Sequence, residues 1–462
     1  MKQSRFNIWV SDYPRKGEHL LFNARTQALL KINQGLRQEL DALNNTRKVI
    51  PGTQLQENLS SLRENGIIIE DDMQEAEQLK EFFHQLQYES SRKMACEVTI
   101  LTTYNCNFRC TYCFEEQVRD DIFLDKPTSD AIVRWLINRA EKEDLKSIFL
   151  VFYGGEPLLN IKPIYDISWA LQEWAGKKHI GFGFGIITNG SLLTADLVDK
   201  FLPVGLKEVR VTLDGDRDAH NQKRPFADGK PSFDLIVDNI KKIIDKVSVG
   251  VVGNFDQSNY RSIFSLIDYL EKEKILKRLN RIEFAPLNPR LGPPDNPAAV
   301  DMGHCLSFFD GNGLHREVVA IKQELIRRGV VIDTGLAINA CALNMKNSGL
   351  TIDPKGAIYK CNALVGYPQF SLGTVFDNKF KKREEVFLAM RAWEQCPQDC
   401  PYLPMCQGGC RFFSYMEQND LAKVSCKKAY LDQITPELIK MEYEQLIAKR
   451  QEKDETKVTA CP

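Results

Sequence analysis

The sequence predicts an α/β protein with a partial (β/α)6 barrel of the TIM type at its centre. A small winged-helix-like α+β domain precedes the barrel, and a cysteine-rich domain follows it. Two observations carry this prediction. Six apolar strand candidates alternate with helical segments before residue 335, which is the pattern of a parallel sheet. The thirteen cysteines form two groups, and residues 114–304 between them contain none. We expect domains at residues 1–90, 91–335 and 336–462.

The composition is that of a globular protein without a polyanionic partner. The chain has 61 basic and 62 acidic side chains and a formal net charge of −1. A nucleic-acid-binding protein more often shows a basic surplus, so we expect no nucleic-acid partner. No run of roughly 18 apolar residues is present, so we expect no membrane span. The first residues lack the apolar core of a signal peptide, so we expect a cytoplasmic protein.

Residues 1–90 are predicted to form the winged-helix-like domain. Two short β-type runs, two stretches with apolar residues at helical spacing and a β-branched run follow one another at residues 6–10, 20–23, 26–43, 55–62 and 67–69. That order of strands, helices and a final strand is typical of such a module. A charged amphipathic helix over residues 73–87 is expected to lead to the next domain.

Residues 91–335 are predicted to form the barrel. The six strand candidates are residues 97–103, 147–154, 181–188, 208–215, 247–253 and 281–287. We expect a weaker seventh strand at residues 330–333 and a long loop over the proline-rich residues 286–300. Functional residues are expected at the carboxyl ends of the strands, as in barrels of this type.

Residues 336–462 combine short strands and turns with most of the cysteines. Seven lie between residues 341 and 426, namely Cys341, Cys361, Cys396, Cys400, Cys406, Cys410 and Cys426. This segment has too little apolar pattern to fold on burial alone, so bound metal is expected to supply much of its folding free energy. A terminal amphipathic helix is predicted over residues 435–455.

The first cysteine group follows the first barrel strand directly. Cys106, Cys110 and Cys113 are separated by three and by two residues. Three thiolates on one loop hold three irons of a cubane cluster and leave the fourth iron open to another ligand. Structural zinc is the alternative, but it usually takes four protein ligands, and no histidine lies nearby.

Three further motifs stand at consecutive strand ends: YGGEP at residues 153–157, ITNG at 187–190 and VTLDG at 211–215. Together with the cysteine spacing and the aromatic Tyr112 before the last cysteine, they resemble the radical SAM superfamily. The resemblance implies that the open iron binds the amino and carboxylate groups of S-adenosylmethionine. One electron then cleaves this cofactor to methionine and a 5′-deoxyadenosyl radical, which removes a hydrogen atom from the substrate.

The strand ends also offer groups that bind S-adenosylmethionine. Glycines let the backbone approach a ligand, and Glu156 can accept a hydrogen bond from the methionine ammonium. Ordinary strand-end hydrogen bonds are the alternative for Thr188 and Thr212, and a surface ion pair is the alternative for Arg224. No catalytic base is assigned. The predicted cofactor-binding set is Tyr112, Gly154, Gly155, Glu156, Pro157, Thr188, Asn189, Thr212 and Arg224.

The second cysteine group resembles the SPASM extension of radical SAM enzymes, including IDPKGAIYKC at residues 352–361 and CPYLPMCQGGC at residues 400–410. The resemblance implies two auxiliary [4Fe–4S] clusters. One would take Cys396, Cys400, Cys406 and Cys426, and the other would take Cys341, Cys361 and Cys410. The chain departs from the family in having three residues, not two, between Cys396 and Cys400. Structural zinc is again the alternative.

Three cysteines remain outside these sets. The second auxiliary cluster either recruits Cys305 as its fourth ligand or keeps an open iron for a substrate thiolate. Cys305 as a small buried apolar residue is the alternative. Cys96 is expected in the core, and Cys461 needs no role.

Radical SAM proteins with a SPASM extension act mostly on peptides. The resemblance favours a maturase that installs a thioether or carbon–carbon crosslink in a ribosomally made peptide. Residues 1–90 would then capture the leader of a precursor peptide as an added strand, although a packing lid is the alternative. An electron donor such as flavodoxin or ferredoxin is implied.

Two other functions stay open. An anaerobic sulfatase maturase would form formylglycine, but such enzymes place an aspartate base after the cysteine that matches Cys361, where this chain has Asn362. A non-catalytic iron–sulfur electron carrier is the second alternative, but it needs no S-adenosylmethionine site.

Overall fold

The computed structural model describes residues 1–92, 94–113, 115, 118–287, 314–338, 340–377 and 383–458. The chain divides into two compact units, each assembled from separate segments. Unit 1 comprises residues 1–86, 307–340 and 391–462, and unit 2 comprises residues 87–306 and 341–390. These units cut across the three domains expected from the sequence, whose bounds stay a prediction.

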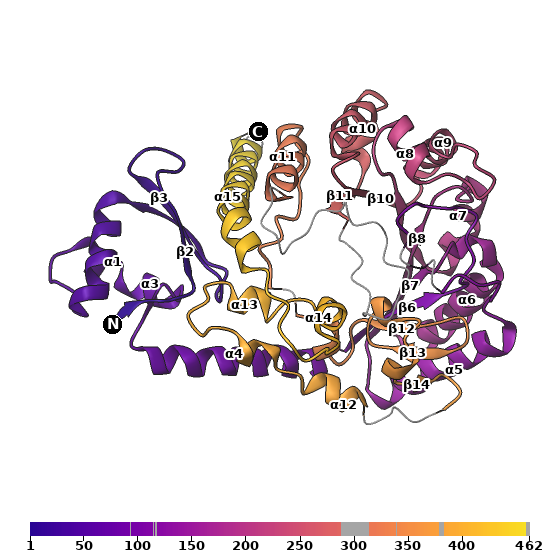
Figure 1. Cartoon of the computed structure of the whole chain (residues 1–462), viewed down its shortest axis with the longest axis horizontal. Coiled ribbons are helices and arrows are strands. Elements are labelled where there is room, and N and C mark those ends of the chain that lie inside the picture. The colour runs from indigo at the N-terminus through magenta and orange to yellow at the C-terminus, as the bar shows by residue number, and fades with distance from the viewer. Residues whose placement is uncertain are drawn as a thin grey trace. The chain divides into compact units, whose positions relative to one another are not determined.

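Unit 2 contains the barrel. Its parallel strands are β6 (Ala95–Leu101), β7 (Ser147–Tyr153), β8 (Gly181–Thr188), β9 (Leu206–Thr212), β10 (Ser248–Phe255) and β11 (Arg281–Pro286). Each coincides with one of the six strand candidates, so the predicted partial barrel is confirmed (Figure 1). Strands buried on both faces contain nearly continuous apolar residues, which is why they were recognisable in the sequence.

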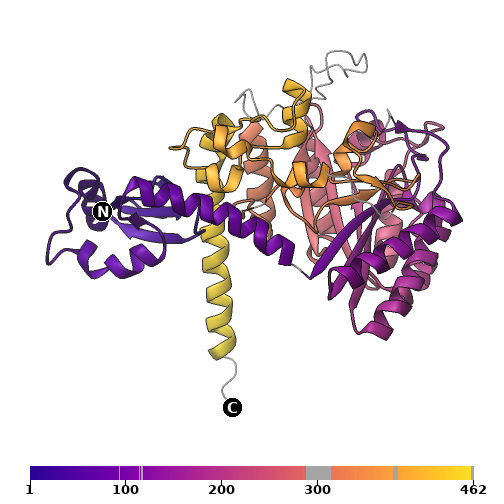
Figure 2. The ribbon, with the colours of Figure 1, turned by 90° about the horizontal axis from the view of Figure 1, so that it is seen from below.

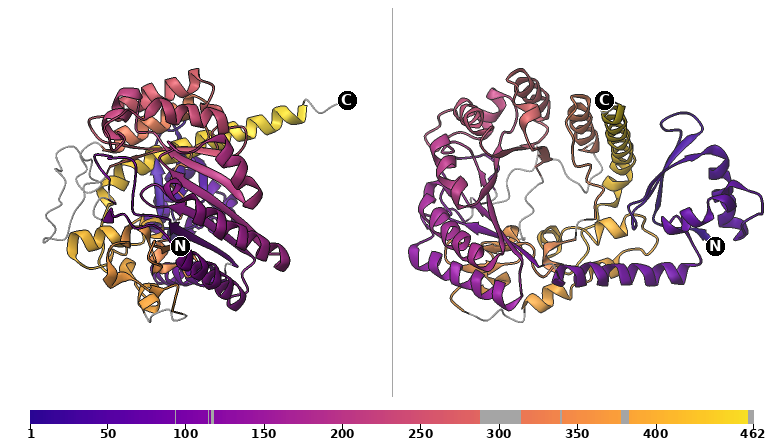
Figure 3. Two further views of the ribbon diagram at one scale, coloured as in Figure 1. Left: turned by 90° about the vertical axis from the view of Figure 1, so that its right-hand side faces the viewer. Right: turned by 180° about the vertical axis from the view of Figure 1, so that it is seen from behind.

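Helices cover the outer face of this sheet (Figure 3). They are α5 (Lys126–Lys142), α6 (Ile161–Lys178), α7 (Ala195–Phe201), α8 (Arg217–Lys223), α9 (Phe233–Ile243) and α10 (Tyr260–Lys272). In α5, the Asp125 carboxylate caps the first turn by accepting a 2.8 Å hydrogen bond from Thr128 N. Ile132 and Leu136 of the same helix are fully buried, as expected for an apolar stripe that faces a sheet.

The same sheet continues beyond β6 into the cysteine-rich segment. β12 (Leu350–Ile352) pairs in parallel with β6, and β13 (Ala357–Tyr359) and β14 (Gly373–Thr374) extend it. The sequence predicted short strands here but not their place in the barrel sheet. An unpaired β6 edge would expose a row of backbone hydrogen-bonding groups, and β12 satisfies them. Unit 2 also contains α12 (Arg383–Leu388).

Unit 1 begins with the N-terminal segment. A three-stranded antiparallel sheet of β2 (Asn7–Val10), β3 (Glu18–Asn23) and β4 (Leu29–Asn33) is followed by α1 (Gln34–Thr46), α2 (Gln54–Glu57), α3 (Leu59–Glu64) and β5 (Ile68–Ile69), which pairs with β1 (Lys2–Gln3). α4 (Asp72–Arg92) comes next, and its residues from 87 onward belong to unit 2. The order of strands, helices and a strand agrees with the winged-helix-like pattern.

The helix expected over residues 26–43 is wrong in its first part. Leu29–Asn33 forms β4 instead, and α1 begins only after it. The Asn33 side chain accepts a 2.8 Å hydrogen bond from Leu36 N and so caps the helix. Apolar residues of the strand and the helix share one core, so their spacing resembles a single helical stripe.

The other α-helices described in unit 1 lie in its later segments. They are α11 (Leu314–Arg327), α13 (Leu403–Cys406), α14 (Arg411–Gln418) and α15 (Lys428–Val458). α15 is one long helix that extends beyond the predicted range at both ends (Figure 2). It packs against α11 and the N-terminal sheet, where Tyr13 and Tyr443 meet edge to face with ring centres 6.4 Å apart. None of the described helices is long and apolar enough to span a bilayer.

Short 3₁₀ helices occur in both units: η2 (Pro157–Asn160), η3 (Leu202–Val204), η4 (Leu276–Arg278), η6 (Ala342–Asn344), η7 (Asn362–Leu364), η8 (Pro368–Phe370) and η9 (Ala392–Gln395).

The expected seventh strand at residues 330–333 is wrong. α11 ends before Gly329, whose φ of +74° reverses the chain, and the following residues form no strand. The Gln445 side chain satisfies the backbone groups of Ile332 that a neighbouring strand would otherwise bind. Its Oε1 accepts from Ile332 N at 2.9 Å, and its Nε2 donates to Ile332 O at 3.2 Å. The proline-rich loop lies outside the described residues from residue 288 onward, as do Cys305 and Cys461.

Candidate active site

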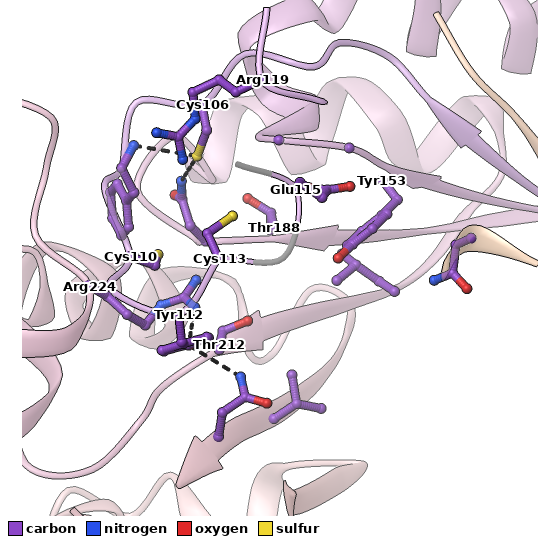
Figure 4. Close-up of a pocket in the computed structure, with 18 of the residues that line it drawn as sticks. Cys106, Cys110, Tyr112, Cys113, Glu115, Arg119, Tyr153, Thr188, Thr212 and Arg224 are labelled. Carbon is purple, nitrogen blue, oxygen red and sulfur yellow. Dashed lines mark hydrogen bonds between the residues drawn. The ribbon is translucent and has the colours of Figure 1, made fainter. Parts of the chain in front are cut away.

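A pocket of about 420 Å³ opens at the carboxyl ends of the barrel strands (Figure 4). It lies entirely in unit 2. All three cysteines of the first group line it, and so do seven of the nine predicted cofactor-binding residues: Tyr112, Gly154, Gly155, Thr188, Asn189, Thr212 and Arg224. Residues from the first five strands and their loops are therefore brought together, as the strand-end motifs predict.

The cysteine loop is held on two sides by backbone hydrogen bonds. Glu156 N, just after β7, donates to Asn105 O at 2.9 Å. On the other side, Arg109 N donates to Pro225 O at 2.9 Å, and Thr111 N donates to Lys223 O at 3.0 Å. The loop thus has a fixed place between the second strand and the segment after the fourth strand.

Burial favours the protonated form of two thiols of this loop, those of Cys106 and Cys110, in the absence of metal. It raises the pKa of Cys106 to about 12, and it raises the pKa of Cys110 while the nearby Arg224 opposes that shift. A bound cation displaces such protons and takes thiolates as ligands. Among the described residues, no three His, Cys, Asp or Glu side chains are arranged to share one metal ion. In a cubane cluster each thiolate binds an iron of its own.

Glu156 and Pro157 are the two predicted residues that do not line the pocket. Glu156 is fully buried, and its carboxylate accepts hydrogen bonds from Thr188 Oγ1 at 2.7 Å, Asn189 N at 2.8 Å and Leu158 N at 3.0 Å. It therefore orients the third strand end behind the pocket wall instead of presenting its oxygens to the pocket. Pro157 is also buried, and its carbonyl accepts from Thr102 Oγ1 at 3.1 Å.

Gly154 and Gly155 are glycines because another part of the backbone passes close to them. The neighbouring group is the backbone of the cysteine loop and not the expected ligand. A Cβ on Gly154 would lie 2.5 Å from Thr103 O, and a Cβ on Gly155 would lie 2.2 Å from Asn105 O. Gly154 also has a φ of +126°, which other residues rarely adopt. The absent side chains thus make room for the backbone that carries the cysteine loop.

Arg224 is a buried residue of the pocket and not part of a surface ion pair, since only 8% of its surface is exposed. Its Nη1 donates to the Tyr112 hydroxyl at 2.6 Å and lies 3.7 Å from Asp214 Oδ2. Its Nε is buried without a hydrogen-bond partner. An unsatisfied cationic donor beside the cysteine loop fits the carboxylate of a bound ligand.

Asp214 and Asn254 complete this network and were missed in the sequence. The Tyr112 hydroxyl bonds to Asp214 and also accepts from Asn254 Nδ2 at 3.2 Å. Asp214 Oδ1 accepts from Asn254 N at 2.7 Å, and burial raises the pKa of the Asp214 carboxyl. Asp214 stands in the VTLDG motif just after β9, and Asn254 lies near the carboxyl end of β10; these positions were the available signal.

The first auxiliary set is gathered within unit 1. We call Cys396, Cys400, Cys406 and Cys426 the four-cysteine group. The pKa of Cys396 is raised to about 11, first by burial and then by the other three thiols of the group. Cys410 also belongs to unit 1 and is exposed, whereas Cys341 and Cys361 belong to unit 2. Both ligand sets stay predictions. Cys96 is buried on β6, as expected for a core residue.

Comparisons with known proteins agree with this site. Residues 100–256 match the radical SAM superfamily. The chain is 24% identical over 331 residues to a cysteine-type anaerobic sulfatase-maturating enzyme of Clostridium novyi (strain NT), covering 66% of this chain and 85% of that protein. It thus contains a radical SAM domain and is a radical SAM enzyme related to sulfatase maturases and peptide-modifying enzymes, for which a [4Fe–4S] cluster and S-adenosylmethionine are implied.

Two solved structures share the fold. One is native anSMEcpe with bound AdoMet and Kp18Cys peptide, with 17% identity, a TM-score of 0.58 and coverage of 77% of this chain and 99% of that chain. The other is Streptococcus suis SuiB bound to precursor peptide SuiA, with 14% identity, a TM-score of 0.53 and coverage of 93% of this chain and 99% of that chain.

Proposed function

We propose that this enzyme modifies a ribosomally made peptide and forms a crosslink in it, with a thioether favoured over a carbon–carbon bond. The observation that carries the choice is the place of Asn362, which lines the same pocket as the three cysteines. This is the position where sulfatase maturases are expected to hold an aspartate base. A neutral amide does not accept a proton near neutral pH, so formylglycine chemistry lacks its base here.

The pocket residues have separate tasks in this proposal. Cys106, Cys110 and Cys113 hold the iron–sulfur cluster, and the free Nε of Arg224 binds the carboxylate of S-adenosylmethionine. When bound, the two cofactors supply a 5′-deoxyadenosyl radical that abstracts a hydrogen atom from a peptide carbon. Glu156 keeps Thr188 and Asn189 oriented toward the ligand.

The cysteine-rich segment is proposed to hold two auxiliary [4Fe–4S] clusters. The four-cysteine group would hold one, and Cys341, Cys361 and Cys410 would hold the other. The mutual electrostatic influence of the thiols in the four-cysteine group supports the first assignment. A flavodoxin or ferredoxin would deliver the electron that cleaves S-adenosylmethionine. The auxiliary clusters would take up the electron that is released, together with a proton to solvent, when the peptide radical closes the crosslink. The cytoplasm is the proposed location.

The N-terminal sheet is proposed to bind the leader of the precursor peptide. β4 is an edge strand of the order β2-β3-β4 and pairs only with β3 among the described strands. An extended peptide gains main-chain hydrogen bonds by adding to such an edge. Binding there would also raise the effective concentration of the attached core peptide at the pocket.

Formylglycine formation is the second candidate function. It is favoured by the match to the cysteine-type sulfatase maturase over 85% of that protein. A non-catalytic electron carrier is not supported, because the pocket combines the cysteine loop with a buried arginine whose Nε is unsatisfied.

The test uses the full-length enzyme, reconstituted with iron and sulfide under anaerobic conditions. It is incubated with S-adenosylmethionine, a reductant and candidate precursor peptides encoded beside its gene. We expect 5′-deoxyadenosine and a peptide that has lost two hydrogen atoms but kept its sulfur. Cys113→Ala is the control and should abolish both products. A peptide aldehyde that a hydrazide reagent captures would instead support formylglycine formation.

A further inference from the structure

Arg411 is a charged side chain in the interior of the cysteine-rich part of unit 1. It directly follows Cys410 and begins α14. Only 1% of its surface is exposed, and it heads the largest fully buried side chains of the described chain. Arginine stays protonated in proteins, and burial of a charge is costly unless polar groups compensate it. A fully buried guanidinium therefore calls for a specific reason.

The guanidinium joins two segments that carry ligand cysteines. Its Nη2 donates to the carbonyl oxygens of Gly408 and Gly409, the latter at 2.8 Å. These glycines form the turn between Cys406 and Cys410. Its Nη1 donates to Lys423 O at 3.0 Å, three residues before Cys426. One side chain thus fixes the turn after the third member of the four-cysteine group relative to the loop before the fourth.

The turn at Gly408 and Gly409 contacts both Arg411 and Cys406. Gly408 and Gly409 have φ values of +84° and +83°, and a Cβ on Gly409 would lie 1.9 Å from Ser425 O. Their carbonyl groups face Arg411. The backbone N–H groups of the same two glycines donate hydrogen bonds to the sulfur of Cys406.

A second residue of α14, Ser414, also holds the loop that leads to Cys426. Ser414 Oγ contacts Lys423 O at 2.7 Å and Asp420 O at 2.8 Å. Ser425 N donates to Gly408 O at 3.0 Å. The loop that leads to Cys426 is therefore held by α14 and by the glycine turn together.

The charge of Arg411 lies beside the ligand-bearing loops. Its guanidinium bonds to the turn that directly follows Cys406 and to the loop three residues before Cys426. A cluster bound by four thiolates carries net negative charge, and it gains one more negative charge on reduction. A cation in the water-excluded interior stabilises the reduced form more than an exposed cation does, because water and salt screen the exposed one.

We propose that Arg411 is a positioning residue for an auxiliary cluster bound by the four-cysteine group, and that its buried charge raises the reduction potential of this cluster. The inference rests on the auxiliary clusters of the proposed function. It adds a residue that binds no iron itself but sets both the loading and the potential of the site.

The test isolates this cluster in the full-length chain. Replacing the remaining described ligand candidates with alanine, namely Cys106, Cys110, Cys113, Cys341, Cys361 and Cys410, leaves the four-cysteine group as the intended site. In this background, anaerobically reconstituted Arg411, Arg411→Gln and Arg411→Lys proteins are compared by iron and sulfide content and by potentiometric titration followed by EPR. Lys428→Gln is the matched control, since Lys428 lies near Cys400 but its side chain is 46% exposed.

We expect Arg411→Gln to shift the reduction equilibrium at least tenfold toward the oxidised cluster, which is about 59 mV for one electron. Lys428→Gln should shift it much less. Arg411→Lys should keep the parent potential but load less iron, because lysine lacks the planar fork that binds several carbonyl groups at once. Full iron content and an unchanged potential in Arg411→Gln would overturn the inference.

Two outcomes separate this inference from the function on which it rests. If Arg411→Gln takes up no iron, Arg411→Lys decides: the parent potential in the lysine variant supports the role of the charge, and a lowered potential overturns it. If the parent background itself binds no cluster, the auxiliary site is refuted, and the inference about Arg411 falls with it.

Discussion

Arg224 Nη1 donates a 2.6 Å hydrogen bond to the hydroxyl of Tyr112, the residue just before the third cysteine of the cluster loop. The loop after the first strand is thereby tied to the segment after the fourth strand. The same arginine lines the pocket, and its buried Nε has no hydrogen-bond partner. One side chain therefore links the geometry of the cluster loop to the binding of a carboxylate.

Replacing Arg224 with methionine is expected to weaken S-adenosylmethionine binding about tenfold to hundredfold, because a hydrogen bond to a charged group is worth about 1.5–3 kcal/mol. Leaving Asp214 buried without its cation should also destabilise the protein by about 3–5 kcal/mol. Calorimetric titration of the reconstituted enzyme measures the first effect, and thermal unfolding measures the second. Arg217→Met is the control, since the Arg217 side chain is 56% exposed in a surface pair with Asp234.

Gly155→Ala is expected to lose the cluster at the first cysteine group. A Cβ there would meet Asn105 O at 2.2 Å and push the cysteine loop away from the pocket. Gly176→Ala is the matched control, because a Cβ at that position in α6 meets nothing within 4 Å. Alanine should even stabilise α6 slightly. Iron content and absorbance after reconstitution provide the measurement, and normal loading of Gly155→Ala would contradict the role given to this glycine.

The stability of the metal-free protein is expected to fall in mild acid because of His220. Burial lowers the pKa of its imidazole to about 3, and the ring is held by Asp214 N at 3.2 Å and Ser232 Oγ at 3.1 Å. A base with a lowered folded-state pKa contributes stability above its unfolded pKa of about 6.5. That stability falls by about 1.4 kcal/mol per pH unit below this value.

Thermal unfolding between pH 5 and pH 7.5 (about the range in which histidine titrates) measures this dependence. His220→Gln should unfold at lower temperature at neutral pH but show a flatter pH profile than the parent. His179→Gln, at an exposed helix end, should leave the profile unchanged. Equal slopes in the parent and in His220→Gln would refute the assignment.

Asn362→Ala tests whether the side chain of Asn362 takes part in the reaction. If no base acts at this position, turnover with the precursor peptide should stay within about tenfold of the parent, since removal of a general base typically costs 10²–10⁴-fold. Formation of 5′-deoxyadenosine should be unchanged. A loss of about a thousandfold in peptide product with intact cofactor cleavage would show that the side chain of Asn362 takes part in the reaction.

The six barrel strands were predictable because buried parallel strands appear in the sequence as apolar runs. β12 and β14 were not placed in the sheet, since strands of three and two residues carry no usable period. The apolar residues of β4 continue the stripe of α1, so their spacing predicts a helix where the chain forms a strand. Short elements are defined by their partners in space, and single-sequence periodicity does not contain that information.

The candidate site, like the fold, was predictable only in part. Spacing and strand-end position identified the cysteine loop and most of the pocket wall. They did not show which way the Glu156 carboxylate turns, because neighbouring residues in a tight turn face opposite sides. Asp214 was inside a recognised motif, but its role depends on Tyr112, which is 102 residues away in the chain. Such contacts appear only when the strands are assembled.

The most direct test of the central claim is mass spectrometry of a precursor peptide after incubation with the reconstituted enzyme, S-adenosylmethionine and reductant. We predict stoichiometric 5′-deoxyadenosine together with a peptide that is lighter by two hydrogen atoms, keeps all its sulfur and carries a new crosslink in its fragment spectrum. A formylglycine aldehyde in place of the crosslink would contradict the claim.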